Sequence, residues 1–199
     1  MLKLTNLDIK TRNTLLSGFN YTFNSGKLYG LVATNGSGKT TFFRAITKLI
    51  KINDKSISIN NNSSIFYFET HEWFDKNLTG FDYLKFFKKE YNSNVDETEV
   101  IKFWNMEDYI KIPIKKYSLG MKQRVLIALY QITNSDIMLM DEITNGLDEE
   151  SRTLLFSLLN DFKRAGKTII ISSHYKEDII YHSDYLMSLE NRKMEVKKL

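Results

Sequence analysis

The pattern of hydrophobic and polar positions changes several times along the first third of the chain. Near the N-terminus apolar and polar residues alternate, which predicts half-buried strands joined by a polar turn. A continuous apolar run then precedes a glycine-rich stretch, which is typical of a buried strand followed by a loop. The predicted elements are strands at 2–9, 15–23, 27–33, 57–59 and 65–68 and a helix at 40–50.

Helical spacing of apolar residues replaces this pattern at 71–132, and strands and helices alternate afterwards. The later elements are a strand at 137–140, a helix at 149–164, a strand at 168–172, a helix at 176–182, a strand at 185–189 and a short basic strand or tail at 192–199. Strands separated by helices predict parallel pairing with helical crossovers. We therefore expect one α/β domain over 1–199, with a parallel sheet, N-terminal antiparallel strands and an inserted helical subdomain at 71–132.

The amino-acid composition limits the classes of protein to which the chain can belong. The chain has 199 residues, of which 42% are hydrophobic and 26% charged, as in a globular domain rather than a disordered one. It has no cysteine, which excludes disulfides, thiolate nucleophiles and cysteine zinc sites and fits a reducing compartment. The apolar runs have strand length, so we expect no membrane span, and the N-terminus does not resemble a secretory leader. The net charge of +4 indicates no particular partner.

A candidate phosphate-binding loop lies between the predicted strand at 27–33 and the helix that follows it. Its sequence is ATNGSGKT at 33–40, with Ala33 at the first glycine position of the motif. Glycines let backbone N–H groups turn toward phosphates, and a helix N-terminus adds partial positive charge. Lys39 would reach the β- and γ-phosphates, and the Thr40 hydroxyl would bind Mg²⁺. The alternative is a glycine-rich turn without this function.

Two acids, Asp141 and Glu142, directly follow the predicted buried strand at 137–140. The carboxyl end of such a strand faces the ligand edge of an α/β sheet. Asp141 would hold Mg²⁺, and Glu142 would orient or deprotonate an attacking water. A solvated acidic turn would have the same local sequence.

The segment YSLGMKQR, at 117–124, opens a helix with apolar periodicity. Ser118 is a favourable N-cap, and Gly120 permits close approach of another backbone. Lys122 and Arg124 oppose the usual preference for acids near a helix N-terminus, and an anion bound there would explain them. An ordinary capped helix with a basic face is the alternative.

Together with TNGLD at 144–148 and SSH at 172–174, these segments resemble the nucleotide-binding domain of an ABC transporter, over residues 2–195. The form of YSLGMKQR is similar to that of bacterial drug and peptide exporters. The resemblance implies a P-loop NTPase core and a dimer in which two domains enclose two molecules of ATP with Mg²⁺. Each site would join the phosphate loop of one protomer to the YSLGMKQR segment of the other.

The resemblance also assigns roles to residues. Thr40 and Asp141 would bind Mg²⁺, and Glu142 and His174 would be catalytic, with His174 contacting the γ-phosphate and holding Glu142 and water in line. Ser118 and Gly120 would contact the γ-phosphate across the dimer interface, and Asp148 would couple the two sites. The expected phosphate-loop contacts come from Ala33, Thr34, Asn35, Gly36, Ser37, Gly38, Lys39, Thr40 and Thr41.

The sequence departs from this family pattern at several positions. Glu69 or Thr70 stands where a glutamine is usual, and Ile143 replaces the usual proline after the catalytic acid. Leu119 stands for the first glycine of the usual signature pair. No aromatic residue lies at 9–12, where one normally stacks on adenine, so weaker base discrimination is expected.

The leading hypothesis is an ATP hydrolase subunit, peripheral on the cytoplasmic face of the cell membrane, without a nucleic-acid partner. It would power a separate multi-span permease that exports a peptide, an antibiotic or another amphiphile. The alternatives are an ABC ATPase without a transport role and a weakly active nucleotide-binding partner in a heterodimer. A groove that receives a permease helix would favour transport; its candidate lining residues, which could equally be core, are Phe74, Leu78, Phe81, Tyr83 and Phe87.

Overall fold

Parallel pairing between strands far apart in the chain organises the fold, in a computed structural model that describes residues 1–34, 36–60, 62–173 and 175–199. Within these residues the larger sheet has the order β5-β6-β7-β3-β8-β9. All neighbours in it are parallel except β9, which pairs antiparallel with β8. Its strands are β3 (Lys27–Val32), β5 (Ile65–Tyr67), β6 (Ile137–Met140), β7 (Thr168–Ser172), β8 (Tyr185–Glu190) and β9 (Lys193–Lys198).

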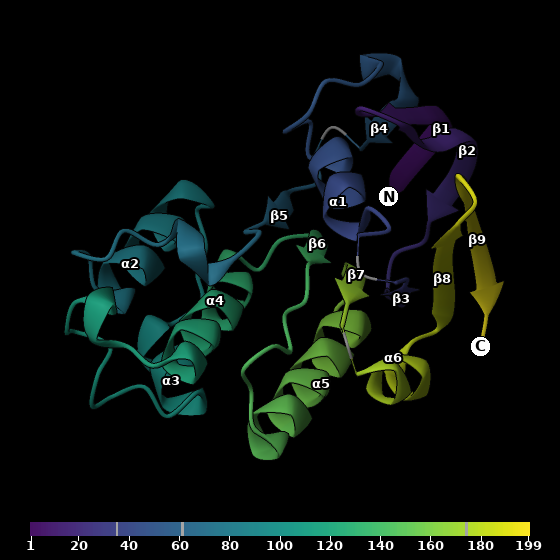
Figure 1. The fold of residues 1–199 in the computed structure, drawn as a ribbon. Coiled ribbons are helices and arrows are strands. Elements are labelled where there is room, and N and C mark those ends of the chain that lie inside the picture. Colours follow the sequence, from purple (N-terminus) through teal and green to yellow (C-terminus); the bar gives the residue numbers. More distant parts are fainter. Residues whose placement is uncertain (35, 61, 174) are drawn as a thin grey trace.

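A smaller antiparallel sheet is formed by the N-terminal strands β1 (Leu2–Lys10) and β2 (Thr14–Phe23) with β4 (Ile57–Ile59). Strand β1 lies in the middle and pairs antiparallel with both neighbours. The predicted antiparallel opening of the chain is therefore confirmed. In Figure 1 this sheet lies at the same end of the molecule as β8 and β9, next to α1 (Lys39–Ile46).

Helices occupy the other end and one face of the molecule (Figure 1). They are α2 (Gly80–Glu90), α3 (Glu97–Phe103), α4 (Leu119–Thr133), α5 (Glu149–Arg164) and α6 (Lys176–His182), and short 3-10 turns lie at Asp54–Ser56, His71–Trp73 and Ile114–Lys116. The predicted α/β class is confirmed, and most strand and helix bounds agree with the prediction within a residue or two. Helix α1 is shorter than expected because Lys48 has a left-handed backbone with φ of 59°, which ends the helix before residue 50.

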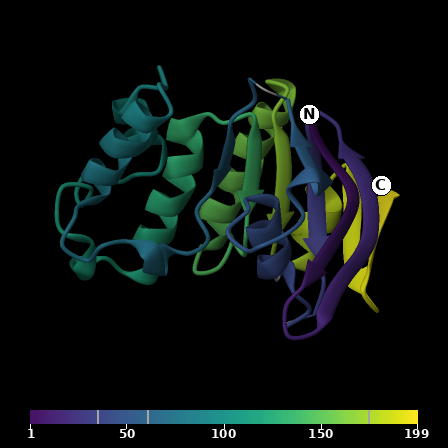
Figure 2. The same ribbon diagram turned by 90° about the horizontal axis from the view of Figure 1, so that it is seen from above.

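The larger sheet lies between two hydrophobic layers, and alternate residues of its strands face opposite layers. In β6, Met138 and Met140 join the cluster that includes α4 and α5. Ile137 and Leu139 join the cluster that includes α1 and the antiparallel sheet. Figure 2 shows the strands between these layers, with the helical end and the antiparallel sheet on opposite sides. Burial on both faces explains why β6 reads as a continuous apolar run.

Aromatic side chains join β5 to the helical region. The rings of Phe66 and Phe87 lie 5.3 Å apart, and those of Phe68 and Phe74 lie 5.0 Å apart. Phe74 is buried in this cluster. The aromatic residues considered for a docking groove thus pack largely as core, in agreement with the alternative stated for them, whereas Leu78 is 44% exposed.

Tyr130 of α4 offers a test of how this cluster is held. Its buried hydroxyl accepts a hydrogen bond from the Phe68 N–H at 3.3 Å and donates one to the Leu139 carbonyl at 2.5 Å. Tyr130→Phe removes both bonds, so we expect the free energy of unfolding to fall by about 1–3 kcal/mol. Urea unfolding measures this loss, with Tyr181→Phe, on a ring that is 85% exposed, as the control expected to match wild type. A loss as large in the control would contradict the assignment.

Candidate functional site

Three loops meet at the carboxyl edge of the parallel sheet. Strands β6, β7 and β3 are adjacent and parallel, so the segments that follow them lie side by side. These segments are the phosphate loop after β3, the acid pair after β6 and the Ser172 end of β7. The sheet therefore brings together residues separated by more than one hundred positions in the sequence.

Lys39, the first residue of α1, points back over the phosphate loop. It is only 7% exposed, and its Nζ donates to the carbonyl oxygens of Ala33 at 3.2 Å and Thr34 at 3.5 Å. The same Nζ lies 3.7 Å from Oε1 of Glu142. Ala33 is not among the described residues with positive φ, so alanine replaces the motif's glycine without backbone strain. This arrangement places a buried ammonium group beside a helix N-terminus, where anions bind favourably.

Asp141 is the most buried acid of the site. Its two carboxylate oxygens accept hydrogen bonds from the Thr40 hydroxyl and, at 2.6 Å, from the Ser172 hydroxyl. Burial raises the pKa of Asp141 above its usual value, while these hydrogen bonds act in the opposite direction. A neighbouring cation would favour the ionised form. The predicted pair Thr40 and Asp141 is thus in direct contact.

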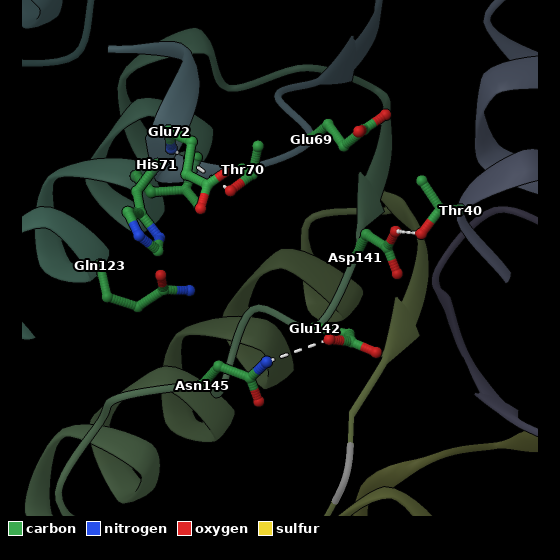
Figure 3. A pocket seen from close by; sticks show the side chains of 10 residues that line it. Thr40, Glu69, Thr70, His71, Glu72, Gln123, Asp141, Glu142 and Asn145 are labelled. Carbon is green, nitrogen blue, oxygen red and sulfur yellow. Dashed lines mark hydrogen bonds between the residues drawn. The ribbon is translucent and has the colours of Figure 1, made fainter. Parts of the chain in front are cut away.

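Glu142 has a left-handed backbone, with φ of 47°, which is uncommon for this residue type and is found at functional sites. Its N–H donates to the Ser172 hydroxyl at 2.8 Å. Its Oε2 accepts from Nδ2 of Asn145 at 3.1 Å, as Figure 3 shows. The strained turn therefore holds the carboxylate between Lys39 and Asn145.

Sequence reasoning gave no role to Ser172 or Asn145. Both lie in segments that carried the family resemblance, at the end of a strand and three residues after Glu142. Their positions were visible in the sequence, but their hydrogen bonds depend on how β6 and β7 pair. Ser172 connects the two acids, since its hydroxyl donates to Asp141 and accepts from Glu142.

A cavity of about 330 Å³ opens onto the acids (Figure 3). Glu69 and Thr70, the two candidates for the glutamine position, both line it. The Glu69 carboxylate binds the Arg44 guanidinium and the Tyr67 hydroxyl, and these bonds lower the pKa of Glu69 below its usual value. Thr70 caps the following 3-10 turn through its hydroxyl, which accepts from the Glu72 N–H. The remaining lining residues are Thr40, His71, Glu72, Gln123, Leu126, Asp141, Glu142 and Asn145.

The YSLGMKQR residues line a different cavity, of about 230 Å³. Ser118 caps α4, as predicted, by accepting from the Met121 N–H at 3.2 Å. Gly120 allows close approach, because a Cβ there would lie 3.2 Å from the Gly146 carbonyl oxygen. Asp148 caps α5 through Ser151, and Arg124 donates to both of these residues. No described residue lines both this cavity and the one at Glu142.

The remaining predicted site residues fall into two groups. Thr34, Gly36, Ser37, Gly38 and Thr41 lie in the phosphate loop or the first turn of α1. Asn35 and His174 lie outside the described residues. The Thr40 hydroxyl and the Asp141 carboxylate, which are in contact, fit a magnesium site. Mg²⁺ binds few protein oxygens and takes its other ligands from water and phosphate. Among the described residues, no group of three or more His, Cys, Asp or Glu side chains is arranged to hold a metal ion.

Residues 16–145 match the sequence profile of the ABC transporter family. The chain belongs to this family. Over its full length it is 34% identical to the uncharacterized ABC transporter ATP-binding protein YybJ of Bacillus subtilis, covering 96% of that protein. It is 30% identical to the lantibiotic transport ATP-binding protein SrtF of Streptococcus pyogenes, covering 90% of it. Both alignments cover the whole of this chain.

The fold agrees with that of solved ABC domains. A dimeric ATP-binding cassette in a post-hydrolysis state, bound to ADP and phosphate, superposes with a TM-score of 0.85 at 21% identity, over all of this chain and 99% of the other. The chain is therefore an ABC ATPase domain, an ATP-binding subunit of the kind that works with transporters. Across the described parts of the chain, no helix combines the length and apolarity of a membrane span.

Ser172→Ala tests the bridge between the acids. Loss of the shared hydroxyl leaves Asp141 and the Glu142 backbone without their common partner, so we expect the ATP hydrolysis rate to fall about 10- to 100-fold. Steady-state phosphate release measures this change, and urea unfolding checks that the fold persists. Ser157→Ala, on the exposed face of α5, is the matched control. Wild-type turnover by the Ser172 variant would contradict the bridging role.

Proposed function

We propose that this ABC ATPase domain is a subunit that hydrolyses ATP to power a separate membrane permease, which exports a peptide, an antibiotic or another amphiphile. The observation that carries the proposal is the meeting of Thr40, Asp141 and Glu142 at one cavity, with the Lys39 ammonium group 3.7 Å from the Glu142 carboxylate. Relatives named for lantibiotic transport and teichoic acids export support an exported amphiphile as the substrate class. The subunit would work at the cytoplasmic face of the membrane, where ATP is available.

The phosphate loop, Lys39, Thr40 and Asp141 each have a distinct role in this proposal. The phosphate loop binds the phosphates through its backbone N–H groups, and Lys39 neutralises charge on the β- and γ-phosphates. Thr40 and Asp141 hold Mg²⁺. The chemistry that the bound ion supplies is neutralisation of charge between the β- and γ-phosphate oxygens. In the structure the Lys39 ammonium contacts the Ala33 carbonyl and lies near Glu142. On ATP binding, Lys39 would exchange these contacts for phosphate oxygens.

Glu142 is the proposed general base. Its carboxylate accepts a proton from the water that attacks the γ-phosphorus, while the leaving ADP carries away the bridging oxygen. Asn145 and the Ser172 hydroxyl fix the carboxylate and the backbone that supports it. His174, which follows β7 by two positions in the sequence, is proposed to contact the γ-phosphate and hold the water in line.

Two copies of the chain are proposed to complete each site. Ser118 and Gly120 line a cavity separate from that of Glu142, which supports contact with a nucleotide held by the partner rather than by the same chain. Asp148 lies beside this cavity and is linked to α4 through Arg124. It is therefore well placed to couple the two sites. The partner copy is a second chain of this kind or a related one.

Glu142→Gln separates binding from hydrolysis. The amide keeps the shape of the side chain but cannot accept the proton, so we expect turnover to fall at least about 100-fold. ATP binding survives, and an ATP-bound dimer accumulates. Phosphate release and size-exclusion chromatography with ATP measure the two effects, with the exposed Glu150→Gln as the control. Hydrolysis at the wild-type rate would overturn the role of Glu142.

Purification of the tagged protein from native membranes in mild detergent, with and without ATP, tests the coupling to transport. Recovery of one multi-span membrane protein is the expected result. Recovery of soluble or ribosomal partners alone would favour an ABC ATPase without a transport role. That outcome would leave the proposed chemistry of the cavity intact and remove the permease from the proposal.

A further inference from the structure

Helices α5 and α6 lie next to each other, and each follows a loop of the candidate site (Figure 1). Helix α5 follows the loop at 142–148, which begins with Glu142. Helix α6 follows the loop at 173–175, which includes His174 in the sequence. Contacts between these two helices and their preceding loops therefore decide how Glu142 and the segment around His174 are held relative to each other.

The start of α6 has little support from the helix itself. The helix has seven residues, of which Ile179 alone is buried, and its N-cap residue, Tyr175, makes no side-chain capping hydrogen bond. Helices of this length are marginal unless other parts of the fold hold them. The position of the first turn of α6 therefore depends on contacts with neighbouring elements.

Arg152 of α5 makes these contacts. Its Cζ lies 4.2 Å from the centre of the Tyr175 ring, and its Nε lies 3.5 Å from Oδ2 of Asp178 in the first turn of α6. A guanidinium over the face of an aromatic ring is attracted by the ring electrons. Leu155 and Leu159 are fully buried, so Arg152 extends from a helix that is itself fixed. The Arg152 side chain is only 21% exposed, which limits screening by solvent.

The same guanidinium also contacts the loop that follows β6. Nη1 of Arg152 donates to the Leu147 carbonyl oxygen at 3.4 Å. The next residue, Asp148, caps α5 through the Ser151 N–H, so the end of this loop is fixed on both sides of the Leu147 carbonyl. One side chain thus joins the loop after Glu142 to the first turn of α6.

The two loops are joined a second time, directly after β7. The hydroxyl groups of Thr144 and Ser173, both buried, share a hydrogen bond of 2.6 Å. The Ser173 hydroxyl oxygen also accepts a bond from the Tyr175 N–H at 3.0 Å. Ser173 precedes His174 in the sequence and Tyr175 follows it. Both neighbours of His174 are therefore tied to the loop at 142–148, one through Thr144 and the other through Arg152.

We propose that Arg152 is a positioning residue for ATP hydrolysis, because it fixes the segment at 173–175 against the loop that carries Glu142. The inference rests on the proposed roles of Glu142 and His174. Arg152 lines neither the cavity at Glu142 nor the one at Ser118, so it acts through the geometry of the loops and not by contact with the nucleotide. Without its guanidinium the segment keeps the Ser173 bond but loses its contact at Tyr175, and the two reacting loops are less often aligned.

Steady-state phosphate release by Arg152→Gln tests this role. Glutamine keeps a polar side chain but removes the charge and the planar group that contacts Tyr175 and Asp178. We expect kcat to fall about 10- to 100-fold, while the KM for ATP stays within about twofold because the phosphate loop is unchanged. Arg164→Gln, at the 80% exposed end of the same helix, is the matched control and keeps the wild-type kcat. Urea unfolding checks that both variants are folded.

Combination with His174→Ala separates positioning from a general loss of structure. In this background the group to be positioned is absent, so adding Arg152→Gln lowers the remaining rate by less than about twofold. Single-turnover hydrolysis of radioactive ATP measures these slow rates. Histidine ring NMR spectra give a second readout, since the sequence has three histidines. With Mg²⁺ and ATP in the Glu142→Gln background, Arg152→Gln shifts or broadens the His174 signal and leaves the His71 signal unchanged.

Three results would overturn the positioning role of Arg152. They are a wild-type kcat in Arg152→Gln, a further 10- to 100-fold loss on the His174→Ala background, and a His174 signal that does not respond to Arg152→Gln. A different result would refute the proposed function on which the inference rests. Wild-type turnover by His174→Ala would remove His174 from the proposed mechanism, whatever the effect of Arg152→Gln.

Discussion

The parallel pairing of β7 with both β6 and β3 is the constraint on which the candidate site depends. It sets the register that brings the phosphate loop, the acid pair and Ser172 to one edge of the sheet. The hydrogen bonds at that edge are short-range consequences of this register: Ser172 reaches Asp141 and the Glu142 N–H, and Asp141 reaches Thr40. A shift of one residue in β7 would turn Ser172 to the other face of the sheet and break these bonds.

Burial of the sheet on both faces also explains the electrostatics of the site. Asp141 emerges from a strand with no exposed residue, so its carboxyl is desolvated and its pKa raised, and nearby hydroxyl groups stabilise it. Glu69, in contrast, meets a guanidinium and keeps a lowered pKa. The pKa values of two acids that line one cavity thus shift in opposite directions, because burial dominates at Asp141 and the hydrogen bond from the Arg44 guanidinium dominates at Glu69.

Local sequence signals predicted most of the fold. The apolar run of β6, the alternation of β1 and the cap at Ser118 are each determined by a few neighbouring residues, and each was correctly assigned. The end of α1 was predicted too late, because apolar spacing continues past the left-handed residue Lys48. The same limit applies to the site: Lys39 and Asp141 are recognisable from their motifs, but the bond of Asn145 to Glu142 depends on a turn whose backbone the sequence does not reveal.

Helix α4 contributes consecutive side chains to two separate cavities. Gln123 lines the cavity at Glu142 and donates to the Ile143 carbonyl at 2.5 Å, whereas Arg124 lines the cavity at Ser118. A helix of fifteen residues moves as one rigid body, so α4 cannot move at one cavity without also moving at the other. The shapes of the two cavities are therefore coupled, because a tilt or slide of α4 against the sheet changes both at the same time.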